Sequence, residues 1–226
     1  ILAEQGFTGA PAITVEAAEV KPIWADLGGR WVMTDQYVKP YPICRWAHAP
    51  IDGVRELMLA NSLTHDDIAG IRINTFHEGV CLFQGVPETT SVAQYSLSFA
   101  VAAQAVHGRI GLEHVSGAGL CDAQVLAMID RISVAESDAH NASFPNTRDA
   151  DVQITLHDGR VLDSGLVHAR GGSERPMPEA DIITKFEEFA GPVLGAARTT
   201  AIRDAVLGLA DGSSCLADLR AHLYDP

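Results

Sequence analysis

The sequence predicts an α+β fold, in which an all-helical portion accompanies a smaller α+β lid domain containing an antiparallel hairpin. Three observations carry this prediction. Apolar residues recur at helical spacing from about Pro50 to Ala60, alternate with polar residues on both sides of Asp158-Gly159, and return to helical spacing after Asp181. The chain has 226 residues and 47% apolar content, which is enough to bury a substantial core.

The first part of the chain is expected to be largely irregular. It opens with a helix end at Gly6 and a Gly/Pro turn to Pro11, and proline-punctuated, extended sequence covers 31–50. Because a residue before proline avoids the α region, Lys39 and Tyr41 are expected in a stiff, non-helical stretch. The sequence starts without Met and inside a helical pattern, which we interpret as a fragment of a longer chain.

The central part is expected to mix strands and helices. Residues 71–75 alternate apolar and polar side chains, as a half-buried strand does. A helix is predicted from a cap at Ser91 to Gly108, and another over 122–132. Asp158-Gly159 lies between two alternating runs, and this dipeptide strongly favours a tight hairpin.

Helical sequence returns at the end of the chain, with three helices predicted between Asp181 and Leu223. No repeat, low-complexity segment or long linker interrupts the chain. The predicted division is the end of a helical domain, an α+β lid domain, and C-terminal helices that return to the helical domain: 1–64, 65–172 and 173–226.

Composition limits the function and the location. The net charge of −13 and a pI of about 5.0 argue against nucleic acid, although a local cluster of cations can still bind a small anion. No apolar run reaches the roughly 18 residues of a membrane helix, and no signal peptide is visible. The cysteines are widely spaced, which predicts reduced thiols in a cytoplasmic protein: Cys44, Cys81, Cys121 and Cys215.

The segment 39–48 concentrates ionisable side chains more than any other stretch. An ammonium, a guanidinium, an imidazole, a thiol and a phenol lie within ten residues, and two prolines stiffen its start. Such a rigid segment suits a site that holds an anion and moves protons, because Arg binds carboxylates bidentately and His titrates near neutral pH. A surface loop with solvated charges is the alternative.

Two other patterns in the sequence resemble ligand-binding motifs only in part. His77, Glu78 and Cys81 have the spacing of metal ligands on a helix, but they follow a predicted strand and no second ligand pair accompanies them. A solvated loop is therefore the better interpretation there. Gly117-Ala118-Gly119 lacks the Lys-Ser/Thr of a phosphate-binding loop, and the sequence contains no Gly-x-Ser-x-Gly element of an α/β-hydrolase.

Four landmarks, taken in order, resemble those of the MmgE/PrpD family. They correspond to its G-F-T-G-P segment, its K-x-Y/F-P-x-C-R-x-x-H signature, the A-x-F-S-x-x-Y start of a helix, and the P-x-S-x-x-x-x-x-K-F entry to the last helices. In this sequence they are Phe7–Pro11, Lys39–His48, Ala93–Phe99 and Pro176–Phe186.

The resemblance implies a fold and a chemistry. Members combine a large all-α domain with a smaller α+β lid, place the active site between them, and form homodimers. Their activities include 2-methylcitrate dehydratase, cis-aconitate decarboxylase and iminodisuccinate epimerase, and none needs a metal or organic cofactor. We therefore expect a cofactor-free lyase or isomerase that moves a proton next to a carboxylate of a small di- or tricarboxylate.

The resemblance also implies roles for residues of the segment 39–48. The family's catalytic lysine falls on Lys39, which is expected to stabilise an enolate-like charge. Cys44 stands where the decarboxylase branch has a histidine, which weakens the decarboxylase assignment. His48 is the candidate acid/base, and Arg45 either clamps a carboxylate or braces the fold. Tyr41 and Cys44 are candidate substrate contacts.

The lid helix departs from the family at one position. The family tyrosine falls on Phe99, so Tyr95, one helical turn earlier, is expected to present its hydroxyl on the same face. Ser96 beside it is a candidate substrate contact. Pro50 is a further departure, and it is expected to leave His48 in a loop.

Alternatives to the enzyme follow from these departures. A non-catalytic, carboxylate-binding or scaffold relative is favoured by the loss of the tyrosine at Phe99. An inactive fragment is favoured because the family's other acid/base groups, an Asp and a His, are expected before Ile1. A metal hydrolase and a pure interaction module have less support. The truncated helical domain is expected to expose an apolar face and to associate through it.

Overall fold

The computed structural model describes residues 36–224 without interruption, and before them Pro22, Ala25, Asp26, Gly28, Gly29, Trp31 and Met33. Residues 37–226 form one compact unit, which contains every helix and strand named below. The predicted helix end at Gly6 and the landmark Phe7–Pro11 lie outside the described residues.

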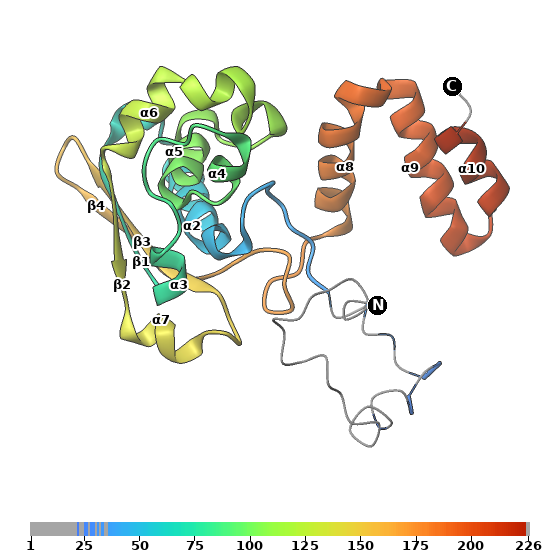
Figure 1. Ribbon diagram of the computed structural model, residues 1–226, viewed down its shortest axis with the longest axis horizontal. Coiled ribbons are helices and arrows are strands. Elements are labelled where there is room, and N and C mark those ends of the chain that lie inside the picture. Colours follow the sequence, from blue (N-terminus) through green and yellow to red (C-terminus); the bar gives the residue numbers. More distant parts are fainter. Residues whose placement is uncertain are drawn as a thin grey trace, which may run out of the picture. The chain divides into compact units, whose positions relative to one another are not determined.

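The α+β part contains a four-stranded mixed sheet (Figure 1). Its strand order is β2-β1-β3-β4; β1 and β2 are parallel, while β1 with β3 and β3 with β4 are antiparallel. The predicted hairpin is confirmed, and Gly159 takes the positive φ of 88° that its tight turn requires. The strands are β1 (Ile68–Thr75), β2 (Ile132–Glu136), β3 (Asp149–Leu156) and β4 (Val161–His168).

Helices pack against this sheet and cover its apolar side chains. α2 (His48–Ala60) lies on β3 and β4, and Gly53 permits this, because a Cβ there would come within 2.8 Å of a Val152 methyl group. The other helices of this part are α3 (His77–Val80), α4 (Thr90–Gln94), α5 (Leu97–His107), α6 (Ala123–Ile129) and α7 (Asp138–Ser143).

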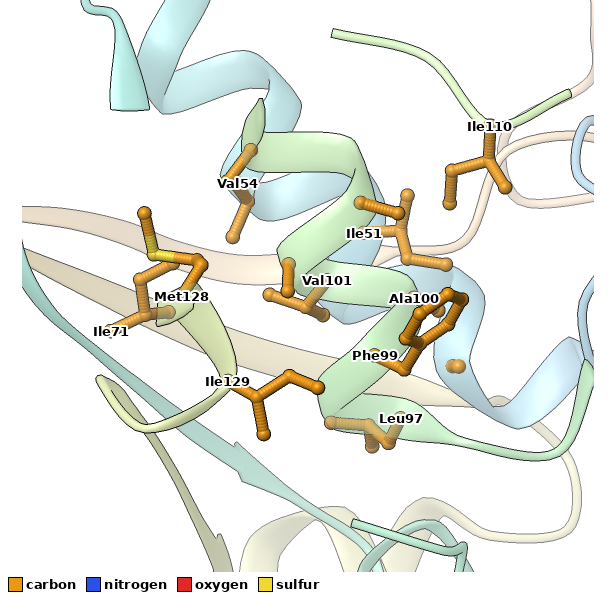
Figure 2. Packing of buried hydrophobic residues seen from close by; sticks show 14 of the residues in the cluster. Ile51, Val54, Ile71, Leu97, Phe99, Ala100, Val101, Ile110, Met128 and Ile129 are labelled. Carbon is orange, nitrogen blue, oxygen red and sulfur yellow. The ribbon is translucent and has the colours of Figure 1, made fainter. Parts of the chain in front are cut away.

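The core is built around α5, which packs against α2 and α6. Nine of its eleven residues are buried, and small residues such as Ala100 allow neighbouring elements to approach closely. Figure 2 shows Phe99 and Val101 of α5 among side chains of the surrounding elements, including Ile51 of α2 and Ile129 of α6. A helix that is apolar on all sides is stable only in such an interior position.

The three C-terminal helices predicted from the sequence are present. α8 packs on α9, and α9 packs on α10. Several apolar side chains on these helices are exposed in the chain by itself, among them Val193, Leu216 and Tyr224. The helices are α8 (Glu179–Leu194), α9 (Ala196–Asp211) and α10 (Leu216–Tyr224).

Two details of the predicted elements were wrong. The helix expected from Ser91 to Gly108 is two helices, because Ser96 starts α5 anew by accepting a hydrogen bond from the backbone N–H of Phe99 at 3.3 Å. The helix expected over 122–132 ends at Ile129, and Ile132 begins the short strand β2, which the sequence reading did not separate from the helix.

The α+β class is confirmed, while the division of the chain at 64 and 172 stays a prediction. Within the described part of the chain, no helix has the length and apolar character needed to cross a membrane.

Candidate functional site

Backbone hydrogen bonds hold the first part of the segment 39–48, from Lys39 to Cys44, on both sides. The N–H of Val38 donates to the carbonyl of Gly171 at 2.9 Å, and the N–H of Cys44 donates to the carbonyl of Gln94 at 2.7 Å. Lys39 lies between these anchors, directly before the two prolines that stiffen the turn. The predicted non-helical stretch is therefore confirmed up to the single 3₁₀ turn that precedes α2.

A buried polar network starts at Tyr41. Its hydroxyl donates to Asp52 Oδ1 at 2.7 Å and accepts from Arg170 Nη2 at 2.8 Å, while the backbone N–H and the Nε of Arg170 donate to Asp52, each at 2.8 Å. Arg170 also lies 3.6 Å from Asp181 at the start of α8. Burial, and then the charge of Asp52, raise the pKa of the Tyr41 phenol. The expected substrate contact therefore has its hydroxyl committed within the fold.

Arg45 binds backbone carbonyls. Its Nη2 donates to Ala169 at 2.9 Å and its Nη1 donates to the carbonyl of Arg170, at the end of β4. Its guanidinium also lies 4.7 Å from the ring centroid of Tyr37, and burial lowers its pKa. Of the two roles expected for Arg45, this geometry favours bracing the fold over clamping a substrate carboxylate.

His48 is enclosed, with 0% of its surface exposed. Its Nε2 is 3.1 Å from the carbonyl of Ile43, which assigns the proton to Nε2, and its Nδ1 then accepts from Arg45 Nη1 at 3.4 Å. Burial lowers its pKa to about 3. A neutral imidazole with both nitrogens engaged is poorly placed for proton transfer, so this geometry favours a structural role for His48 over the acid/base role expected from the sequence.

The expected effect of Pro50 on His48 was also wrong. His48 is the first residue of α2, and Pro50 lies in the first turn of that helix. Proline is tolerated there because the backbone N–H groups of the first turn have no partner within the helix.

Tyr95, Ser96 and Cys44 occupy other environments. Tyr95 is 59% exposed between α4 and α5, whereas Phe99 is 0% exposed inside the core, so the two do not share a helix face as expected. Ser96 is buried and caps α5. Cys44 is half-buried and precedes the 3₁₀ turn at Arg45.

Lys39 faces a hollow that the sequence did not predict. This hollow has a volume of about 500 Å³ and apolar walls, and its lining includes Lys39, Lys185, Phe186 and Phe189. The Nζ of Lys185 lies 5.9 Å from the ring centroid of Phe189. Burial first, and Lys39 second, lower the pKa of Lys185, which means that the two ammonium groups act on each other.

A second, more polar cavity of about 280 Å³ adjoins the first through two shared residues, Tyr41 and Lys185. Further cations that line it are Arg55, Arg109 and Arg170. Asp181 and Glu188 line this cavity as well, and Arg109 and Arg170 are paired with carboxylates of the chain. Within the described part of the chain, the cations without an ion pair that line the two spaces are therefore Lys39, Lys185 and Arg55.

The sequence reading missed three residues at this site: Asp52, Arg170 and Lys185. Lys185 lies in the segment Pro176–Phe186, which resembles the family, so the sequence did contain an indication of its importance. Asp52 and Arg170 carried none, because their pairing joins positions 118 residues apart.

Metal binding has no geometric support in residues 36–224, where no group of three His, Cys, Asp or Glu side chains is arranged to hold an ion. His77 and Cys81, considered above as ligands, contact each other, and His77 also contacts Glu136.

Comparison with known proteins identifies the family to which this chain belongs. Over 196 residues the chain is 24% identical to the cis-aconitate decarboxylase of Aspergillus terreus, a match that covers 82% of the chain and 40% of that relative. The chain thus spans less than half the length of the curated relative that it resembles. Residues 41–211, well over half of the chain, match the model of the MmgE/PrpD C-terminal domain. The chain therefore belongs to the MmgE/PrpD family.

Proposed function

We propose that this chain carries the carboxylate-binding part of a lyase or isomerase that moves a proton next to a carboxylate of a small di- or tricarboxylate. The observation that carries the proposal is that Lys39 and Lys185 line the same apolar-walled hollow. The weak similarity to a cis-aconitate decarboxylase agrees with a lyase-like role. Dehydration resembling that of 2-methylcitrate and epimerisation are the two reactions favoured within this proposal.

Electrostatics explains why such a hollow suits an anion. Two like charges destabilise each other, and Lys39 contributes to the lowered pKa of Lys185. A carboxylate bound between them removes this repulsion and replaces it with attraction. Apolar walls, here from Phe186 and Phe189, exclude water and strengthen the interaction, because Coulomb energies rise as the local dielectric constant falls.

The chemistry follows from where charge develops. Removing a proton from the carbon next to a carboxylate places negative charge on the carboxylate oxygens. Lys39 is proposed as the catalytic group that stabilises this charge, since a fixed cation stabilises the developing anion more than the ground state. Lys185 is proposed to hold the same or a second carboxylate, and the adjoining cation Arg55 extends the site for a larger polycarboxylate.

A non-catalytic, carboxylate-binding protein is the second candidate function. The enclosed position of His48 and the buried phenyl ring of Phe99 favour it, because His48 was expected to transfer protons and Phe99 stands where the family has a tyrosine. The homodimer implied by the family, and the cytoplasmic location predicted from the cysteines, stay part of the proposal for either function.

Binding is the first test. Calorimetric titration of the chain with citrate and with cis-aconitate should give binding that weakens roughly tenfold, about 1.4 kcal/mol, in Lys39→Ala and in Lys185→Ala. Arg220→Ala is the matched control, because Arg220 is an exposed cation on α10, away from both cavities. Equal weakening in all three variants, or none in the two lysine variants, would contradict the site.

Proton exchange separates the two candidate functions. The natural full-length protein is incubated in deuterated water, without added metal, with citrate, 2-methylcitrate, cis-aconitate or iminodisuccinate, and the carbon next to the carboxylate is followed by proton NMR. Exchange that is lost in Lys39→Ala supports the enzyme. Binding of the ligands without exchange supports the non-catalytic protein.

A further inference from the structure

A second constellation of reactive side chains surrounds Cys81, which directly follows α3. Its Sγ lies 3.5 Å from Nε2 of His77, and the Nδ1 of His77 lies 2.9 Å from Oε2 of Glu136. The three side chains form a relay from thiol to imidazole to carboxylate, the order found wherever a side-chain nucleophile is activated by an oriented base.

The hydrogen-bond pattern assigns the protons in this relay. A carboxylate can only accept, so Nδ1 of His77 carries the proton and Nε2 is free to accept from the thiol. Asn141 fixes the arrangement from both sides: its amide donates to Oε1 of Glu136 at 2.7 Å, and its carbonyl accepts from the backbone N–H of His77 at 2.7 Å. The hydrogen bond that His77 donates to Glu136 raises the pKa of His77, which makes the imidazole a better proton acceptor.

The sheet topology explains why these residues meet. β1 and β2 are parallel and end side by side, with Thr75 paired to Glu136. α3 follows the end of β1 and α7 follows the end of β2, so His77 and Asn141 both lie beyond the carboxyl ends of neighbouring parallel strands. Ligand sites of α/β sheets typically form at such ends.

Cys81 also borders a hollow that differs from the one at Lys39. This hollow has a volume of about 410 Å³ and mostly apolar walls, which include Leu82, Phe83, Val92 and Tyr95. Phe83 and Tyr95 are large and exposed, and they flank an exposed thiol. A small molecule with an apolar or aromatic body fits this surface better than a charged one.

We propose that Cys81 is a histidine-activated nucleophile and a site of covalent modification by small, apolar disulfides. His77 takes the proton of the thiol, and the Cys81 thiolate attacks one sulfur of the disulfide. A new S–S bond forms to Cys81 as the original S–S bond breaks. The departing thiolate receives the proton from His77, so atoms and electrons balance without a further reactant.

Reaction with a dithiodipyridine, a neutral aromatic disulfide, tests the proposal. Peptide mapping by mass spectrometry of the 226-residue chain gives the rate at each cysteine. Cys81 should react at least about fivefold faster than Cys121 and Cys215, whose exposed thiols have no hydrogen-bond partner among the described residues. His77→Gln should lower the Cys81 rate to that of these two thiols, and Glu136→Gln should lower it less.

His107→Gln is the matched control, because His107 also contacts a carboxylate, Asp122 at 3.2 Å, and lies outside the relay. It should leave the Cys81 rate unchanged. Circular dichroism of each variant verifies the fold, and if His77→Gln does not fold, Glu136→Gln decides the test. The proposal is overturned if Cys81 reacts no faster than Cys121 and Cys215, or if the folded relay variants react as fast as the parent chain.

Discussion

The stretch from Lys39 to Asp52 places its polar side chains in two contrasting environments. His48 and Asp52 are fully enclosed and hydrogen-bonded, and Tyr41 is buried beside Asp52. Lys39 has no hydrogen bond or ion pair within the described part of the chain and lines an apolar-walled hollow. This contrast in burial and bonding shows that ionisable residues that are clustered in the sequence do not all belong to one functional site. Its enclosed members hold the segment in place, and the open member is left to act on a ligand.

Removing Asp52 should give the largest effect on the enclosed side. Asp52→Ala leaves Arg170 without its buried counter-charge and the Tyr41 hydroxyl without its acceptor. Breaking a buried pair in this way is expected to lower the free energy of unfolding by about 3–5 kcal/mol, measured by urea denaturation. Asp66→Ala, at a side chain that is 88% exposed, should change it by less than about 0.5 kcal/mol. If Asp52→Ala lowers the free energy of unfolding no more than Asp66→Ala does, the contrast between enclosed and open side chains is contradicted.

The buried His48 side chain is expected to make the free energy of unfolding depend on pH. Burial lowers its pKa from 6.5 to about 3, so the folded state favours the neutral imidazole. Its contribution is therefore complete above pH 6.5 and is lost as pH falls from 6.5 toward 3. By pH 5 the free energy of unfolding should drop by about 2 kcal/mol from this residue. Urea denaturation of the parent chain and of His48→Gln, each at pH 5 and above pH 6.5, checks this. If the free energy of unfolding depends on pH identically in both proteins, the prediction is contradicted.

A smaller effect is expected from the Tyr41 hydroxyl. Tyr41→Phe removes the hydrogen bond to Asp52 and the one accepted from Arg170 Nη2, but leaves the two that Arg170 donates to Asp52. The free energy of unfolding should fall by about 1–2 kcal/mol, since each lost hydrogen bond contributes about 1 kcal/mol or less. Tyr95→Phe is the control, since that hydroxyl belongs to an exposed side chain and its loss should be close to neutral. Equal effects at Tyr41 and Tyr95 would mean that the network does not hold the segment.

Lys39→Ala should have the smallest effect on stability. Because the ammonium has no partner among the described residues, the free energy of unfolding is expected to change by less than about 0.5 kcal/mol. The same variant should weaken citrate binding roughly tenfold. Thermal unfolding and calorimetry on one preparation give the change in stability and the change in citrate affinity. A loss of stability comparable to that of Asp52→Ala would mean that Lys39, like His48 and Asp52, holds the segment in place.

The elements show which predictions local sequence can support. The hairpin at Asp158-Gly159 and the helix α2 were predicted, since each follows from a turn dipeptide or an apolar period inside one segment. The strand β2 was missed because its five residues are too short for a period to stand out and they follow α6 almost directly. The break at Ser96 depends on one side-chain hydrogen bond, which periodicity cannot indicate.

The residues of the candidate site also divide into those that local sequence indicated and those that it did not. Local sequence was enough to predict the α+β class, the stiff segment from Lys39 to Pro42, and the motif at Lys39 that resembles the family. The enclosure of His48, the binding of Arg45 to carbonyls at the end of β4, and the position of Lys185 at the hollow of Lys39 became evident only in the folded chain. The physical reason is distance along the chain: backbone preferences act over a few residues, whereas the burial and charge that set a side chain's role come from segments more than a hundred residues away.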